Sequence, residues 1–215
     1  MKTLLTLTLV ACTTIIAVGQ EIRLNLYSAY VFDDKFSSYY DSYNYYEGKV
    51  KGGYQWGAGI EYLLHETYSA ELLYFAQDTK APTRYQIGIG EPVVEGDLDL
   101  KLDYLMLGGL RHIAKPDGKI EGYGGLMFGA AFAKLTDPRI NREATATKFA
   151  WGVRLGANIW ASERVGIKLQ AQLLSVVQGA GGGFYFGTGG TGVGVSAYST
   201  FYQFGLGGGL VFRVK

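Results

Sequence analysis

The stretch KFAWGVRLGANIW, residues 148–160, decides the fold class of this chain. Large apolar side chains stand at its odd-numbered positions, from Phe149 through Leu155 to Ile159, and small or polar residues stand between them. Because side chains alternate between the two faces of a β-strand, this period of two predicts a long strand with one apolar face. The other face carries Arg154 and two glycines, which is unusual for a surface in water, because glycine weakens a strand and covers nothing.

The same alternation recurs outward from this stretch in seven more segments: 21–32, 54–64, 68–78, 98–111, 120–134, 165–174 and 199–214. The predicted strands are about 11–15 residues long, whereas soluble strands average about 5–6 and membrane-crossing strands need about 9–11. Short turns at 65–67, 115–118 and 162–164 alternate with long loops at about 33–50, 79–97, 135–147 and 179–198. This pattern predicts an all-β fold, an eight-stranded antiparallel up-and-down transmembrane β-barrel.

The direction of the apolar face separates a membrane barrel from a soluble, lipocalin-like binding barrel, which would turn that face inward. Glycine and alanine crowd the other face, as a narrow lumen requires. Aromatic residues such as Trp56 and Tyr202 stand near strand ends, as in the girdles of membrane barrels. We therefore expect the apolar face to point outward. In segment 98–111 this face comprises Leu98, Leu100, Leu102, Tyr104 and Met106.

The first residues have the features of an export signal. Lys2 is followed by an uncharged apolar run, and Ala17-Val18-Gly19 offers small residues for cleavage, so we expect a signal peptide at 1–19 and a barrel domain at 20–215. An alternative is cleavage before Cys12, the single cysteine, with lipidation of that residue. The net charge is only +1 and the charges are mixed, which argues against nucleic acid as a partner.

The chain as a whole resembles small outer-membrane β-barrel proteins of the OmpA-like and PorT-like type found in Bacteroidetes. Its ending FGLGGGLVFRVK, residues 204–215, is similar to the terminal strand read by the outer-membrane insertion machinery, although Phe212 is not the last residue. The resemblance implies a cell outer membrane location, with outer-membrane lipid and that machinery as partners, and it implies no defined activity. Short turns face the periplasm in such barrels, so both termini are expected there.

The charges on the polar face form a predicted lumen network: Arg23, Glu61, Glu71, Arg111, Glu121, Arg154, Lys168 and Arg213. Folding back the 115–118 turn places Arg111 opposite Glu121, and the 65–67 turn places Glu61 opposite Glu71. The network is either a gate that binds ions or a salt-bridged plug. We favour the plug because eight strands leave an interior only wide enough for side chains, among them Tyr123, Met127 and Trp160.

Catalytic and metal-binding patterns are weak in this sequence. The histidines His65 and His112 have no serine and acid at a readable spacing, so we expect no enzyme, no metal and no cofactor. The first long loop carries Tyr39, Tyr40, Tyr43, Tyr45 and Tyr46, which are candidates for recognising an envelope protein or glycan, or alternatively for covering the loop itself.

The expected function is a structural or interaction component of the cell envelope. The alternatives are a narrow passive channel or small-ligand transporter, and a lipid-modifying outer-membrane enzyme.

Overall fold

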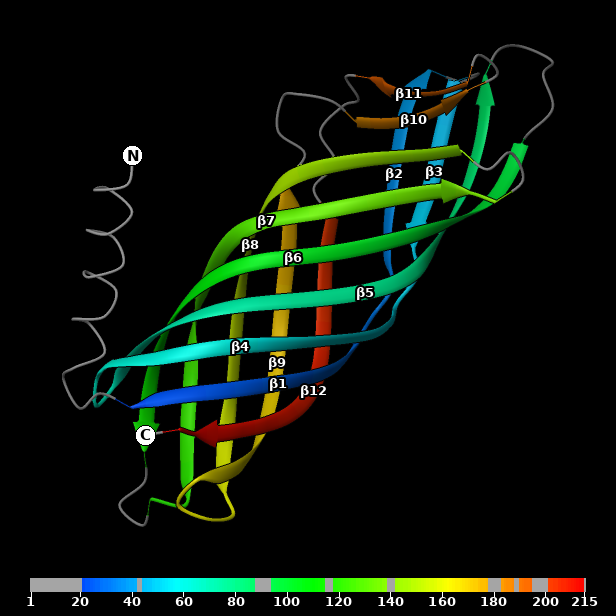
Figure 1. Cartoon of the computed structure of the whole chain (residues 1–215). Coiled ribbons are helices and arrows are strands. Elements are labelled where there is room, and N and C mark those ends of the chain that lie inside the picture. Colours follow the sequence, from blue (N-terminus) through cyan, green and yellow to red (C-terminus); the bar gives the residue numbers. More distant parts are fainter. Residues whose placement is uncertain are drawn as a thin grey trace, which may run out of the picture.

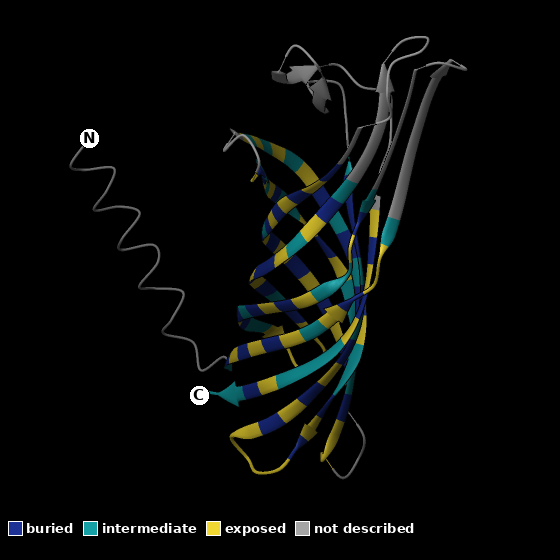
Figure 2. Cartoon of the chain, turned by 90° about the vertical axis from the view of Figure 1, so that its right-hand side faces the viewer, coloured by how far each residue is buried: buried dark blue, intermediate teal, exposed yellow. Residues whose placement is uncertain are grey.

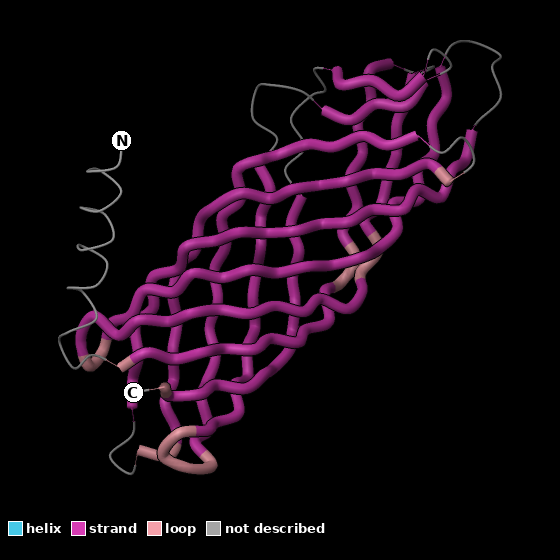
Figure 3. The backbone as a smooth tube through the Cα atoms, viewed as in Figure 1, coloured by secondary structure: helices cyan, strands magenta, loops and turns pink. Residues whose placement is uncertain are grey.

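A computed structural model describes residues 21–41, 44–87, 94–114, 118–138, 142–177, 183–187, 190–194 and 201–214. Eight antiparallel strands close into a barrel: β1 (Ile22–Val31), β4 (Gly53–His65), β5 (Tyr68–Ile87), β6 (Val94–Ala114), β7 (Ile120–Asp137), β8 (Arg142–Trp160), β9 (Val165–Val177) and β12 (Phe201–Arg213). The ring runs β5-β4-β1-β12-β9-β8-β7-β6 and closes by pairing β6 with β5 (Figure 1, Figure 3). The predicted fold class is confirmed. The predicted signal and Cys12 lie outside the described residues.

The barrel is taller on one side than on the other. Strands β5 to β8 have 20, 21, 18 and 19 residues, whereas β1, β9 and β12 have 10, 13 and 13. The hairpin β2 (Asp34–Asp41) and β3 (Asn44–Val50) joins this taller wall, because β3 pairs with β5. A second, separate hairpin consists of β10 (Gly183–Gly187) and β11 (Gly190–Gly194). Much of 33–50, 79–97 and 135–147, predicted as loops, is therefore strand.

The lower end of the barrel is the end that carries the β4–β5, β6–β7 and β8–β9 connections. Around this lower part, buried and exposed residues alternate along most of the strands (Figure 2). The outward side chains are large and apolar: Leu24, Leu26, Ile60, Leu72, Leu107, Leu126, Phe128, Leu155, Ile167, Leu169, Phe204 and Leu206. The prediction of an apolar outside is thus confirmed here. No helix of the described residues is long and apolar enough to cross a membrane.

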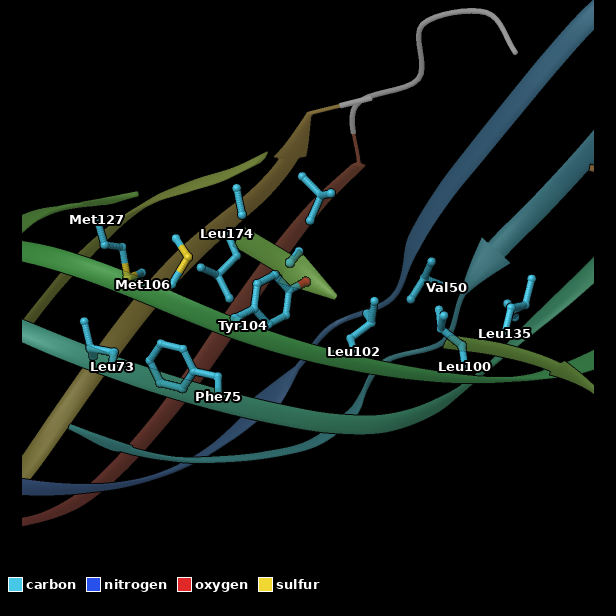
Figure 4. Packing of buried hydrophobic residues seen from close by; sticks show 14 of the residues in the cluster. Val50, Leu73, Phe75, Leu100, Leu102, Tyr104, Met106, Met127, Leu135 and Leu174 are labelled. Carbon is cyan, nitrogen blue, oxygen red and sulfur yellow. The ribbon is translucent and has the colours of Figure 1, made fainter. Parts of the chain in front are cut away.

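The upper part of the taller wall has the opposite polarity, and here the predicted face was wrong. Leu98, Leu100 and Leu102 are 2%, 8% and 2% exposed and point inward, whereas Asp99 and Lys101 point outward. Tyr104 and Met106, predicted on the same outward face, are also buried and point inward lower on β6. The inward residues form an apolar core with Val50, Phe75 and Leu135 among others (Figure 4). The reason is that strand geometry fixes which residues share a face, while the surroundings of that face change along the barrel axis.

Candidate functional site

Below the apolar core, polar side chains fill the barrel interior. The lowest level is an ion network of four carboxylates, four cations and one histidine: Glu21, Glu61, Glu71, Glu121, Arg23, Arg154, Lys168, Arg213 and His112. Glutamines form the next level. The interior therefore changes from ionic to amide to apolar in the upward direction.

Glu121 and Arg23 form the main bridge at the bottom of the ion network. Arg23 Nη1 and Nη2 donate to the two Glu121 carboxylate oxygens at 2.5 and 3.2 Å. The strands β1 and β7 that carry them are four strands apart in either direction around the ring of eight, so this bridge crosses the full width of the barrel. Arg213 lies beside it, with Nε 2.9 Å from Glu21 Oε1 and its guanidinium 3.6 Å from the Trp160 ring centroid.

His112 lies between two carboxylates in the middle of the ion network. Its Nδ1 is 2.7 Å from Glu121 Oε1, and its Nε2 is 2.9 Å from Glu61 Oε1. Ser69 Oγ donates to Glu61 Oε1 at 2.8 Å and lies 2.8 Å from His112 Nε2. Asn25 Nδ2 donates to the other Glu61 oxygen at 2.9 Å. These contacts join β1, β4, β5, β6 and β7 in one buried cluster.

Glu71 and Arg154 form an ion pair at the top of the network, and both side chains are fully buried. Tyr27 OH donates to Glu71 Oε1 at 2.5 Å and accepts from Arg154 Nη1 at 3.1 Å. Lys168 Nζ is 3.7 Å from Glu61 Oε2 and 4.6 Å from the Tyr123 ring centroid. Burying a charged side chain without an opposite charge nearby is very costly in free energy. The charged state of Arg154 and Lys168 therefore depends on the carboxylates close to them.

The amide level above the network also links distant strands. Gln172 Nε2 donates to Gln55 Oε1 at 2.6 Å, and Gln203 Nε2 donates to Gln77 Oε1 at 3.0 Å. Tyr104 OH donates to Gln203 Oε1 at 2.6 Å. Since β6 and β12 are four strands apart, this last hydrogen bond also crosses the full width of the barrel.

The structure brings together seven of the eight residues predicted for the lumen network. Glu61 and Glu71 are register partners, and so are Arg23 and Arg213. The eighth prediction was wrong: Arg111 points outward, because Glu121 pairs with Ala114 and Arg111 pairs with Gly124. The register differs from the expected one by three residues, and an odd shift moves every side chain to the opposite face.

Sequence reasoning missed His112, the residue that this shift turns inward. Ile113 could have indicated this position, because an apolar residue on a membrane barrel is expected to face outward. Side chains alternate along a strand, so Arg111 then also faces outward and His112 faces inward. Asn25, Tyr27 and Ser69 were also missed because uncharged polar residues gave no pattern of their own. Of the loop tyrosines, Tyr43 lies outside the described residues, and the side chains of Tyr39, Tyr40, Tyr45 and Tyr46 lie outside the described part of the structure.

The site offers limited chemistry in this arrangement. Ser69 contacts His112, which contacts Glu121, as in a catalytic triad of serine, histidine and acid. All three residues are 5% exposed or less, so a substrate does not reach them in this arrangement. The Ser69 hydroxyl has a single proton and donates it to Glu61. Among the described residues, no group of three or more His, Cys, Asp or Glu side chains is placed to hold a metal ion.

Three solved structures are similar to this chain at low sequence identity. Neisserial surface protein A gives a TM-score of 0.56 at 10% identity, over 89% of this chain and 96% of that chain. The outer membrane protein AlkL, solved in lipid bilayers, gives 0.51 at 12% identity, over 91% and 90%. Ail, the attachment invasion locus protein of Yersinia pestis, gives 0.44 at 14% identity, over 91% and 100%.

These likenesses show the fold alone: this chain is a closed eight-stranded barrel of the kind found in small outer-membrane proteins. The resemblance seen in the sequence is confirmed at that level, and the Bacteroidetes type stays a prediction. No protein-family model matches the sequence, and no curated protein matches it significantly.

Proposed function

We propose that the protein is an integral outer-membrane barrel with a plugged lumen, which serves as a structural or interaction component of the cell envelope. The observation that carries this proposal is the Arg23–Glu121 bridge across the full width of the barrel, at 2.5 Å and with both residues buried. A second crossing by Tyr104 and Gln203 lies above it. An eight-stranded barrel has little free interior to begin with, so two crossings support a plug rather than an open pore.

The apolar outer surface supports the membrane location. On β6 the outward residues are apolar or small from Ile113 up to Leu105, except for Arg111, and charge begins at Asp103. These nine strand residues at about 3.3 Å each, tilted by about 40°, rise roughly 23 Å, close to the height of about 25 Å of the apolar band of membrane barrels. The taller wall then stands above the bilayer, with charged side chains facing water.

The orientation follows from the same features. Membrane barrels place short turns in the periplasm and their longer elements outside. The lower end, where β1 begins and β12 ends, is accordingly assigned to the periplasm, with the taller wall and the loop tyrosines outside. These extracellular elements are the proposed contact for an envelope partner, and the β12 ending is the proposed signal for the insertion machinery.

Fractionation and planar-bilayer recording test this function. We expect the mature chain to fractionate with outer membranes, to require detergent, and to show no stable open conductance. A chain that is monodisperse in plain buffer would support the soluble, lipocalin-like alternative. A large and stable conductance would show that the plug does not exist and would favour the channel.

The contacts of Ser69, His112 and Glu121 favour one second candidate, a hydrolase. Against it, Glu61 takes the Ser69 proton and the cluster is buried. Incubation with a fluorophosphonate probe separates the two functions. We expect no labelling of the folded protein, and labelling that Ser69→Ala abolishes would establish the hydrolase.

A further inference from the structure

Arg111 differs from the charged residues that lie nearest the lower turns on the other barrel strands. On the other seven barrel strands, the charged residue nearest those turns points into the lumen: Arg23, Glu61, Glu71, Glu121, Arg154, Lys168 and Arg213. On β6 that residue is Arg111, and it is exposed on the outer surface. We propose that Arg111 binds the phosphate of a membrane phospholipid at the lower rim of the barrel.

Among the described residues, the surroundings of Arg111 contain an aromatic ring but no counter-charge. Its guanidinium lies 5.9 Å from the Tyr68 ring centroid. In the described part of the chain, no carboxylate lies within ion-pair distance of it. Guanidinium on a lipid-facing surface is costly unless it reaches the interface or an anion, and its fork of N–H donors matches phosphate oxygens in pairs.

The height of Arg111 matches the headgroup level of one leaflet. It stands three residues before the end of β6 at Ala114, roughly 8 Å along the barrel axis from that end. A side chain of its length reaches the interface from this height. In the proposed orientation this is the periplasmic leaflet, so the inference rests on the proposed membrane function.

The surface next to Arg111 is bare enough to hold a lipid tail. Its cross-strand neighbour Gly124 and the preceding outward residue Gly109 leave backbone uncovered, and a Cβ added at Gly109 would meet nothing within 4 Å. Ile113 and Leu155, 69% and 62% exposed, flank this area. An acyl chain would pack there while its phosphate lies on the guanidinium, and Arg111 sets the specificity for that phosphate.

Native mass spectrometry of the folded protein in maltoside detergent tests the proposal. The variants are Arg111→Gln, Arg111→Lys and, as a matched control, Lys101→Gln, which removes an exposed cation higher on the same strand. Each is mixed with phosphatidylethanolamine, with diacylglycerol of the same tails, or with inorganic phosphate. A heat-dependent shift in gel mobility verifies that each variant is folded.

We expect the unmodified chain and Lys101→Gln to retain one phosphatidylethanolamine, and Arg111→Gln to retain about tenfold less, the effect of one charge-assisted contact. Arg111→Lys should fall between them because lysine offers a point charge without the fork. Equal retention by Arg111→Gln, equal retention of diacylglycerol, or equally tight Arg111-dependent binding of inorganic phosphate would each overturn the proposal. Failure of the membrane function would appear separately, as a chain that needs no detergent.

Discussion

Arg23 and Arg213 are direct register partners on β1 and β12, so two guanidinium groups lie side by side where the first and last barrel strands meet. Glu21 and Glu121 offset this repulsion, because each carboxylate lies within ion-pair distance of both arginines. Trp160 adds its ring, 5.2 and 3.6 Å from the two guanidinium carbons. The first and last strands are thus joined by side chains as well as by their backbone ladder.

Glu121→Gln should destabilise the barrel by about 3–5 kcal/mol, because it removes the carboxylate shared by Arg23, Arg213 and His112 and breaks the main ion pair of the buried Arg23. Denaturant unfolding in lipid vesicles measures the change. The matched control is Glu143→Gln, which breaks a 2.8 Å pair with Lys134 in which both side chains are about half exposed. That variant should lose at most about 1 kcal/mol. Similar losses of unfolding free energy in the two variants would show that the buried network stabilises the barrel no more than a surface ion pair.

Glu71 and Arg154 should be strongly coupled, since both are fully buried and form an ion pair. Each single change, Glu71→Met or Arg154→Met, leaves one buried charge and should cost about 3–5 kcal/mol, whereas the double variant should cost less than the sum. A double-mutant cycle by equilibrium unfolding gives the coupling energy. Strict additivity would mean that the two side chains do not meet.

Leu100 and Leu155 should respond differently to truncation, because one lies in the upper apolar core and the other on the outer surface. Leu100→Ala should cost about 2–5 kcal/mol by leaving a cavity. Leu155→Ala should cost less, because lipid tails fill the vacated space. Unfolding free energies in vesicles compare the two, and a larger loss at Leu155 would contradict the reversal of polarity along the barrel.

Gly209→Ala should weaken the pairing between β12 and β1. A Cβ at Gly209 would collide with the backbone oxygen of Leu26 and lie 3.2 Å from Tyr27 Cα, atoms that move only if the two strands separate. We expect a loss of about 1–3 kcal/mol. Gly109→Ala is the control, since a Cβ there meets nothing within 4 Å, and its stability should change by no more than about 0.5 kcal/mol. Equal stabilities would show that β1 and β12 separate at little cost.

The sequence by itself determined the fold class, the number of barrel strands and most of the lumen residues. Period-two alternation is a local property, so residues such as Glu61, Arg154 and Lys168 were assigned to the inner face from their neighbours alone. The tight turn at 65–67 also placed Glu61 opposite Glu71. Both inferences needed only strand geometry.

The tertiary structure alone decided the register of β6 with β7 and the level at which the barrel changes polarity. The register of β6 with β7 could not be predicted from the turn sequence between them. Because the observed register differs from the predicted one by an odd number of residues, His112 points into the lumen in place of Arg111. The second depends on what surrounds a face at a given height, so Leu100 and Leu155 have similar local patterns and opposite positions. Local periodicity states which residues share a face, and where the surroundings change along the barrel axis, the closed barrel determines which side that face is on.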